Sequence, residues 1–325
     1  MTVTDSAPKL PPLFAVGPEN STAAKEDWGR RRAGLREQWQ AFLGPFPANK
    51  APLKTEILAT EELPDFTRQY VRYQIEDGVT TDGYLLMPRG LTGRLPAVVV
   101  FHQTIKTQAQ QAAGLDASNA ELMHGVQLVR RGYVVLCPRC YIFNDGATYV
   151  ENVTIMQQRH PEWKGMARMT WDAIRAADFL ESLPNVEARR IGGLGHSLGA
   201  KEVLYAAAFD DRYKVAVFSE GGIGLTFTNW EAAWYLGPEI QRAQFSLEHH
   251  QLMALIAPRA FLLLVGDSAD SDASAAYVEA VRPVFRLYGA ENNVAWLNHH
   301  AGHRYPPPAQ DAAEAFLDSH LRAQR

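Results

Sequence analysis

The sequence has few cysteines, no excess of one charge and no long apolar run, and each absence excludes a class of protein. Only two of its 325 residues are cysteine, so no disulfide framework can hold it together. The formal net charge is -4, without the basic patch or stripe that binds nucleic acid. No apolar run approaches the length of a membrane span, and residues 1–14 lack a signal peptide's basic-then-apolar order. We therefore expect a soluble, cytoplasmic protein that binds neither nucleic acid nor membrane.

The two cysteines, Cys137 and Cys140, occur as Cys-Pro-Arg-Cys directly after an apolar run. A Cys-x-x-Cys pair can be a redox motif or half of a zinc site, but the chain has no second pair to complete four ligands. We interpret both residues as reduced thiols at the end of a buried strand. We expect neither a metal nor a cofactor.

Residues 1–50 predict an N-terminal extension. Its first part, to about residue 22, is rich in proline, serine and threonine and is expected to be a loose arm. Residues 23–43 carry tryptophan and leucine at helical spacing, and Gly44-Pro45 would end that helix. Residues 51–325 are expected to form a single α/β domain.

Short, continuous apolar runs alternate with helical patterns through that domain. Such runs are typical of parallel strands buried on both faces. They lie at 96–101, 133–136, 215–218 and 261–265, with helical patterns at 171–180 and 275–288 and a hairpin at 67–75 and 80–87. This alternation predicts a doubly wound, mostly parallel sheet with helices on both faces.

The motif Gly-His-Ser-Leu-Gly at 195–199 follows a predicted strand, 190–194, and precedes a predicted helix, 200–208. A nucleophile elbow needs this strand–turn–helix context, because its serine occupies a tight, strained turn that only small neighbours permit. We therefore predict Ser197 as the nucleophile of a serine hydrolase with an α/β-hydrolase fold.

A serine hydroxyl needs a base to remove its proton, and in this fold the histidine comes last along the chain. Three histidines, His299, His300 and His303, follow the last predicted strand. Gly302 directly precedes His303 and suits a histidine held on a loop. We predict His303 as the base, and His299 and His300 as structural or pocket-lining residues.

Two strand ends offer an acid to orient the histidine. The loop at 267–272 follows the penultimate strand, and within it Asp270 has the expected position. Asp267 could be buried structurally, and Asp272 could cap the next helix. Glu220 follows the strand at 215–218, also at a carboxyl end. We favour Asp270 as the acid, with Glu220 as the rival.

The tetrahedral intermediate requires two backbone N–H donors for its oxyanion. We predict the N–H of Leu198 as the first, since it follows the nucleophile. The second is expected from the loop after the strand at 96–101, from Thr104 in preference to Gln103. His102 is expected to fix this loop through hydrogen bonds.

The region from about residue 96 to the C-terminus resembles the dienelactone hydrolase and acetyl xylan esterase branch of the α/β hydrolases, and is also similar to glucuronoyl esterases. The second similarity rests on Ser197 with Lys201, then Glu220, His249-His250, Pro258-Arg259 and Gly302-His303. It implies that Glu220 can be a catalytic acid and that Lys201 could contact a sugar hydroxyl. The arginine that follows the serine in that family is absent here. An ordinary surface lysine is the alternative for Lys201.

A cap-like insertion is predicted near 222–248, where aromatic side chains follow a strand end. Its Trp230 and Trp234 could line a substrate pocket or pack the insertion against the domain.

These residues together predict an enzyme that cleaves carboxylic esters through an acyl-enzyme intermediate. The expected substrate is a small-molecule or carbohydrate ester, such as an acylated or uronic-acid sugar ester. One alternative is a serine peptidase of the prolyl-oligopeptidase type, although the chain has no propeller-sized second domain. The other is a catalytically silent scaffold that binds a ligand or partner.

Overall fold

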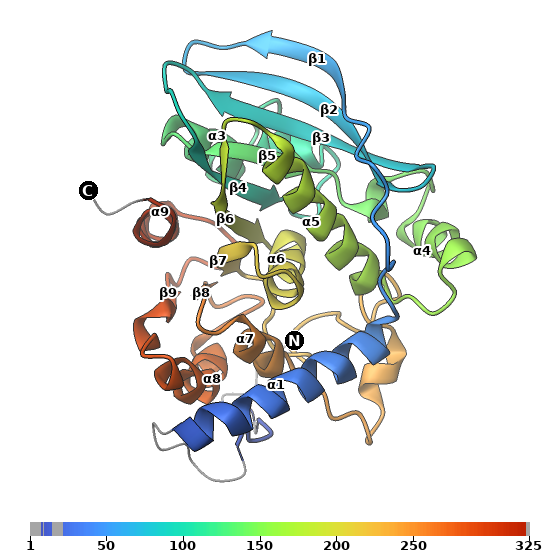
Figure 1. Ribbon diagram of the computed structural model, residues 1–325, viewed down its shortest axis with the longest axis vertical. Coiled ribbons are helices and arrows are strands. Elements are labelled where there is room, and N and C mark those ends of the chain that lie inside the picture. The colour runs from blue at the N-terminus through green and yellow to red at the C-terminus, as the bar shows by residue number, and fades with distance from the viewer. Residues whose placement is uncertain (1–7, 9, 15–21, 323–325) are drawn as a thin grey trace.

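The computed structural model describes residues 8, 10–14 and 22–322, and its centre is a single mixed sheet (Figure 1). The loose arm expected up to about residue 22 lies mostly outside these residues. Within them the sheet has nine strands in the order β1-β2-β3-β5-β4-β6-β7-β8-β9. The strands are β1 (Glu56–Glu62), β2 (Phe66–Glu76), β3 (Val79–Pro88), β4 (Leu95–Phe101), β5 (Val134–Pro138), β6 (Val186–His196), β7 (Tyr213–Ser219), β8 (Ala260–Val265) and β9 (Val294–Asn298).

Strands β5, β4, β6, β7, β8 and β9 are parallel to one another, and β1, β2 and β3 join through antiparallel ladders. The predicted hairpin is confirmed, since β2 pairs with β3 from Phe66↔Pro88 to Glu76↔Val79. Every residue of β5 and β8 is buried. Burial on both faces explains why these strands are continuous apolar runs in the sequence.

Helices cover both faces of the sheet, as predicted. They are α1 (Thr22–Leu43), α2 (Ala109–Ala112), α3 (His124–Arg130), α4 (Tyr149–Arg159), α5 (Gly165–Ser182), α6 (Leu198–Phe209), α7 (His249–Ile256), α8 (Ala275–Leu287) and α9 (Pro307–Leu321). Successive side chains of β4 divide between two apolar clusters, with Val99 and Phe101 in one and Val98 and Val100 in the other. The first cluster includes side chains of α5, α6, α7 and α8, and the second includes side chains of α3 and α9.

The predicted helix of the N-terminal extension is present as α1, which runs beside α7 and α8 (Figure 1). Trp39 of α1 is fully buried and donates a hydrogen bond to Gln251 of α7. Arg36 donates to the carbonyl oxygens of Ala208 and Phe209 at 2.9 and 2.7 Å. These carbonyls end α6 and have no partner within that helix, so Arg36 supplies a cap from a distant element.

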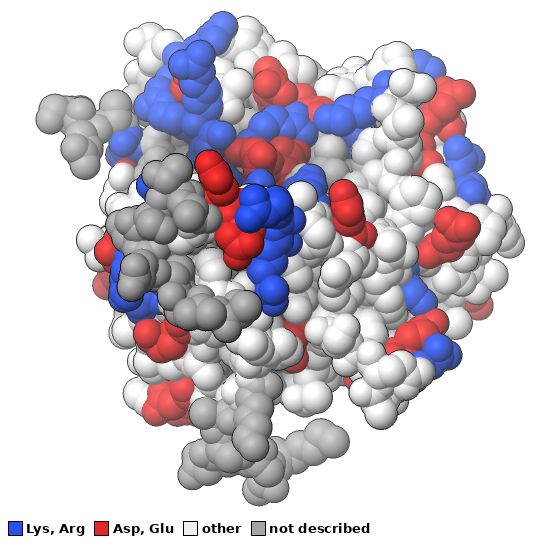
Figure 2. Space-filling model, turned by 60° about the horizontal axis from the view of Figure 1, so that its bottom comes forward, with Lys and Arg blue, Asp and Glu red and all other residues white. Residues whose placement is uncertain are grey.

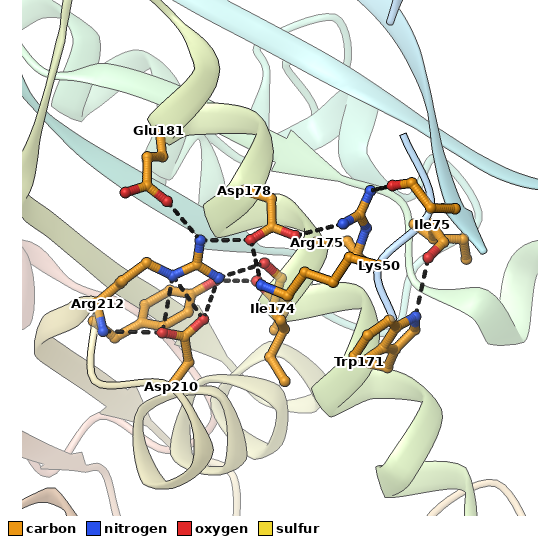
Figure 3. Close-up of polar contacts among 12 residues, drawn as sticks. Lys50, Ile75, Trp171, Ile174, Arg175, Asp178, Glu181, Asp210 and Arg212 are labelled. Carbon is orange, nitrogen blue, oxygen red and sulfur yellow. Dashed lines mark hydrogen bonds and ion pairs between the residues drawn. The ribbon is translucent and has the colours of Figure 1, made fainter. Parts of the chain in front are cut away.

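A charged network joins several elements at the amino end of β7 (Figure 3). Arg212, directly before β7, donates to Asp210, Asp178 and Glu181. Arg175 of α5 bonds to the same Asp178 and donates to the backbone carbonyl of Gln74 in β2. The network therefore fixes α5 relative to β2 and β7. It lies at the amino edge of the parallel strands, opposite to the loops at their carboxyl ends.

Charges of both signs are interspersed on the face turned forward in Figure 2. Among the helices that the structure describes, none combines the length and apolarity needed to cross a membrane. Cys137 and Cys140 are buried free thiols, as expected, and burial raises the pKa of both.

Candidate active site

Ser197 occupies a strained turn between β6, which ends at His196, and α6, which begins at Leu198. Its φ of 58° and ψ of -116° lie outside the regions that non-glycine residues normally adopt. A Cβ on Gly195 would lie 2.0 Å from the carbonyl oxygen of Gly199, and one on Gly199 would lie 2.0 Å from that of Phe101. The elbow therefore needs glycine at both positions, as the motif predicted.

The turn directs the amino end of α6 toward the space beside Ser197. The first N–H groups of a helix have no intrahelical partner, so the N–H of Leu198 is available to an oxyanion. On the neighbouring loop, His102 Nδ1 donates to the carbonyl of Gln103 at 2.7 Å, and Nε2 accepts from the N–H of Cys140 at 3.1 Å. Burial lowers the pKa of His102 to about 4, so the ring is neutral. The expected fixing role of His102 is confirmed, whereas Thr104, exposed on this loop, stays a prediction as the second donor.

His303 and Glu220 form the histidine–carboxylate pair of this site. His303 Nδ1 lies 3.2 Å from Glu220 Oε2. The Glu220 carboxylate is fully buried and also accepts from the N–H groups of Gly266 and Ala269. With Nδ1 donating to a carboxylate, we assign the tautomer that leaves Nε2 as the basic nitrogen. The His303 ring lies 4.8 Å, centre to centre, from that of His196, the residue before Ser197.

The sequence favoured Asp270 as the partner of His303, but in the structure the partner is Glu220. Asp270 accepts from the N–H groups of Gly222 and Ile223 at 2.6 and 2.7 Å and from the Ser274 hydroxyl at 2.9 Å. Burial, opposed by these hydrogen bonds, raises its pKa to about 6. Its carboxylate holds the chain just after Glu220 and does not reach His303.

Asp267 and His300 form a separate pair at the surface, whereas His299 is half-buried and its Nδ1 accepts from the N–H of Ala301. His300 Nδ1 bonds to Asp267 at 2.7 Å, and both side chains are about half exposed. Asp267 is therefore not the buried structural residue that was considered. Asp272 does not cap the next helix, the possibility raised by the sequence, because Ser271 caps the short helix η4 (Asp272–Ser274).

Four consecutive parallel strands each end in a loop with a non-glycine residue at positive φ. These residues are Ser197 after β6, Glu220 after β7, Asp267 after β8 and His300 after β9. A left-handed conformation costs a non-glycine residue of the order of 1 kcal/mol or more. The carboxyl edge of the sheet is therefore where backbone strain gathers, which is typical of a functional site.

Lys201 is not the surface lysine that was considered, because only 4% of it is exposed. Its Nζ donates to Thr228 Oγ1 at 2.6 Å and lies 3.7 Å from the ring centre of Trp230. Burial lowers its pKa well below the usual lysine value. Trp230 is fully buried and donates to the Gly222 carbonyl, so it holds Lys201 and cannot itself line a pocket. Trp234 is half-buried and packs against Tyr149, so part of its side chain stays exposed.

Sequence reasoning missed two polar residues of the site, His196 and Ser219. Both are fully buried, and His196 Nδ1 lies 3.0 Å from Ser219 Oγ. Burial lowers the pKa of His196 well below its usual range, so the ring that packs against His303 is neutral. A histidine inside an otherwise apolar strand end was the available signal. Among the described residues, no group of histidine, cysteine, aspartate or glutamate is arranged to hold a metal ion.

Comparison of the sequence with known proteins identifies a family, and comparison of the structure with solved structures identifies a fold. A model of the dienelactone hydrolase family matches residues 81–244. YtaP of Bacillus subtilis, named as a hydrolase, is 26% identical over 251 residues, which cover 72% of this chain and 80% of YtaP. The 4-O-methyl-glucuronoyl methylesterase of Hypocrea jecorina is 26% identical over 191 residues, covering 49% of this chain and 41% of that enzyme.

Among solved structures, a glucuronoyl esterase from Solibacter usitatus matches with a TM-score of 0.75 at 18% identity. The match covers 97% of this chain and 98% of that one. At such identity the likeness is one of fold, and the predicted α/β-hydrolase fold is confirmed.

Proposed function

The chain belongs to the dienelactone hydrolase family and is a carboxylic ester hydrolase, and from this premise we propose that Ser197, His303 and Glu220 are its catalytic triad. The observation that carries the proposal is the hydrogen bond between His303 Nδ1 and the buried carboxylate of Glu220, beside an elbow that holds Ser197 at positive φ.

In the proposed mechanism, Ser197 Oγ attacks the ester carbonyl while His303 Nε2 takes its proton. The resulting imidazolium is stabilised by the Glu220 carboxylate, whose backbone N–H partners keep it in place. The N–H of Leu198, with a second N–H from the loop at 102–104, receives the negative charge on the oxygen. His303 then returns the proton to the leaving alcohol. Water, activated by His303, releases the acid and restores the serine.

We further propose a carbohydrate ester, acylated or a uronic-acid ester, as the substrate class. Support comes from the relative that is a glucuronoyl methylesterase and from the openness of the site, where 41% of the His303 side chain is exposed. An open reaction centre admits an ester attached to a bulky alcohol. A cytoplasmic location stays a prediction of the sequence.

Replacement of Ser197 tests the chemistry. We expect Ser197→Ala to lower kcat on p-nitrophenyl acetate by about 10⁴-fold or more and to abolish labelling by a fluorophosphonate. Ser182→Ala is the matched control, because among the described residues that hydroxyl bonds only to the Phe179 carbonyl at the end of α5. Equal labelling of wild type and Ser197→Ala would contradict the assignment. Turnover of acetylated xylo-oligosaccharides and glucuronate methyl esters then tests the substrate class.

A further inference from the structure

A cavity of about 420 Å³ lies away from the triad, between the β2–β3 hairpin, the segment after β5, α4 and α5. Neither Ser197, Glu220 nor His303 lines it. Its volume is within the usual range of small-molecule sites. The mechanism proposed for ester hydrolysis does not use this cavity.

Arginines dominate the charge of the cavity wall. Arg72, Arg139, Arg159 and Arg168 line it together with Asp82 and Asp145. On the wall itself the arginines outnumber the acidic residues, while Glu56 and Asp172, outside the wall, pair with Arg72 and Arg168. Guanidinium groups gathered around a concave space favour an anion there.

Two of these guanidinium groups have N–H donors that lack an acceptor among the described residues. Arg168 is 5% exposed, and its Nε donates to both Asp172 oxygens at 2.8 and 3.0 Å. Its Nη2 is buried and has no hydrogen bond to any residue that the structure describes. Arg139 pairs with Asp82 through Nη2, whereas its buried Nε has no partner within the same residues. A buried charged donor without an acceptor is costly, so a ligand that brought an acceptor within reach of either group would be favoured.

The wall also offers one free acceptor and an apolar side. Asn144 Oδ1 is buried without a hydrogen bond from any described residue. Ile155 and Met156 of α4 add apolar surface to the lining. A complementary ligand would carry an anionic oxygen group to accept from the arginines and a hydroxyl to donate to Asn144. It would also present C–H groups to the apolar side of the wall. A bare phosphate ion would leave the apolar side without a partner.

We propose that this cavity is a second binding site, which takes a carboxylate-bearing sugar of about one monosaccharide unit. The carboxylate would bind between Arg168 and Arg139, and a ring hydroxyl would donate to Asn144 Oδ1. The site goes beyond the ester hydrolysis proposed for Ser197 and uses none of its residues.

Calorimetric titration with sodium glucuronate tests the site, with inorganic phosphate as the second probe. The protein is used both untreated and after a fluorophosphonate has blocked Ser197. We expect saturable binding of one glucuronate in both forms, at least tenfold tighter than phosphate. Binding that disappears on blocking would place glucuronate at Ser197 and overturn the inference. Tighter binding of phosphate, or no saturable binding of either probe, would overturn it as well.

Two variants locate the binding independently of any labelling. Asn144→Asp and Ile155→Glu each add a negative charge to the wall and should weaken glucuronate binding at least tenfold. Both changes should leave folding intact, because Asn144 Oδ1 has no described bond to lose and Ile155 is 40% exposed. Val150→Glu is the matched control, since Val150 is 54% exposed on the same helix but does not line the cavity. Unchanged affinity in both test variants would overturn the inference, as would an equal loss in the control.

Discussion

Glu220 and Asp270 are both buried carboxylates near the carboxyl edge of the sheet, and their partners give them different tasks. Glu220 combines two backbone N–H donors with His303, so its charge can serve the imidazolium during turnover. Among the described residues, the Asp270 carboxylate accepts from Gly222, Ile223 and Ser274, so its charge stabilises the backbone of this loop. Substitutions that keep shape but remove charge should therefore show which of the two carboxylates serves catalysis.

We expect Glu220→Gln to lower kcat/KM by about 10²- to 10⁴-fold per folded molecule, because the imidazolium loses its anionic partner. Asp270→Asn should leave the activity per folded molecule close to that of the wild type. In both variants the new amide presents an N–H where a backbone N–H needs an acceptor, which costs about 1–3 kcal/mol of stability. Ester hydrolysis and thermal unfolding of both variants check this. A larger activity loss per folded molecule in Asp270→Asn than in Glu220→Gln would return Asp270 to the triad.

At the residue scale, the nucleophile and the base candidates could be predicted because their signals are local. A five-residue motif identifies Ser197, and chain order with a preceding glycine identifies His303. The choice of acid depends on side-chain direction. Glu220 lies at a φ of 51°, which no motif in the sequence announces. The burial of Lys201 could not be predicted from the sequence either, because it results from contact with residues near 230, which lie far along the chain.

At the element scale, the parallel strands could be predicted because both of their faces are buried. Strand β1 was not predicted, and all seven of its residues are exposed, so no apolar periodicity marks it. Helix α9 was missed for a different reason. It begins at Pro307 within a run of prolines, a residue that is tolerated in the first turn but usually indicates a helix end.

The close approach of the elbow to β4 allows a prediction about stability. Gly199→Ala should destabilise the protein by several kcal/mol or prevent folding, because the new Cβ would meet the backbone oxygen of Phe101 at the end of β4. Gly34→Ala in α1 is the control. Nothing lies within 4 Å of the Cβ it adds, and alanine favours a helix over glycine by roughly 1 kcal/mol. Denaturant unfolding should show loss in the first variant and gain in the second. A well-folded, equally stable Gly199→Ala protein would contradict the geometry.

At the scale of the whole molecule, buried histidines should make stability fall in acid. Burial lowers the pKa of His102, His124 and His250 to about 4, of His249 to about 3, and of His196 well below its usual range. These rings stay neutral in the folded state while the unfolded chain takes up protons below about pH 6.5, so their contribution to stability is lost as pH falls. Burial also lowers the pKa of His299. Burial raises the pKa of Asp172 and Asp270 to about 6, of Glu248 to about 7, and of Glu202 and Glu314 above their usual values, so five carboxyl groups oppose the trend of six histidines.

We therefore expect Tm to decrease steadily from pH 6.5 to 4.5. His124→Phe should reduce the slope of stability against pH by at most about 1.4 kcal/mol per pH unit, since one titrating group is removed. Differential scanning calorimetry across that range measures both quantities. His300→Gln is the control with the opposite sign, because Asp267 raises the pKa of this exposed histidine. A Tm that is flat or rises toward pH 4.5 would show that the carboxylates dominate.

The left-handed residues after β6, β7, β8 and β9 have a consequence for laboratory evolution. Glycine adopts this conformation without the penalty that Ser197, Glu220, Asp267 and His300 bear. A mutant library screened only for heat resistance would therefore favour glycine at Ser197, Asp267 and His300, whereas glycine at Glu220 would leave the N–H groups of Gly266 and Ala269 without their acceptor. At Asp267 and His300 the selected clones would keep their triad, whereas at Ser197 they would be more stable and inactive. Screening for turnover and heat resistance together would separate the two kinds of clone.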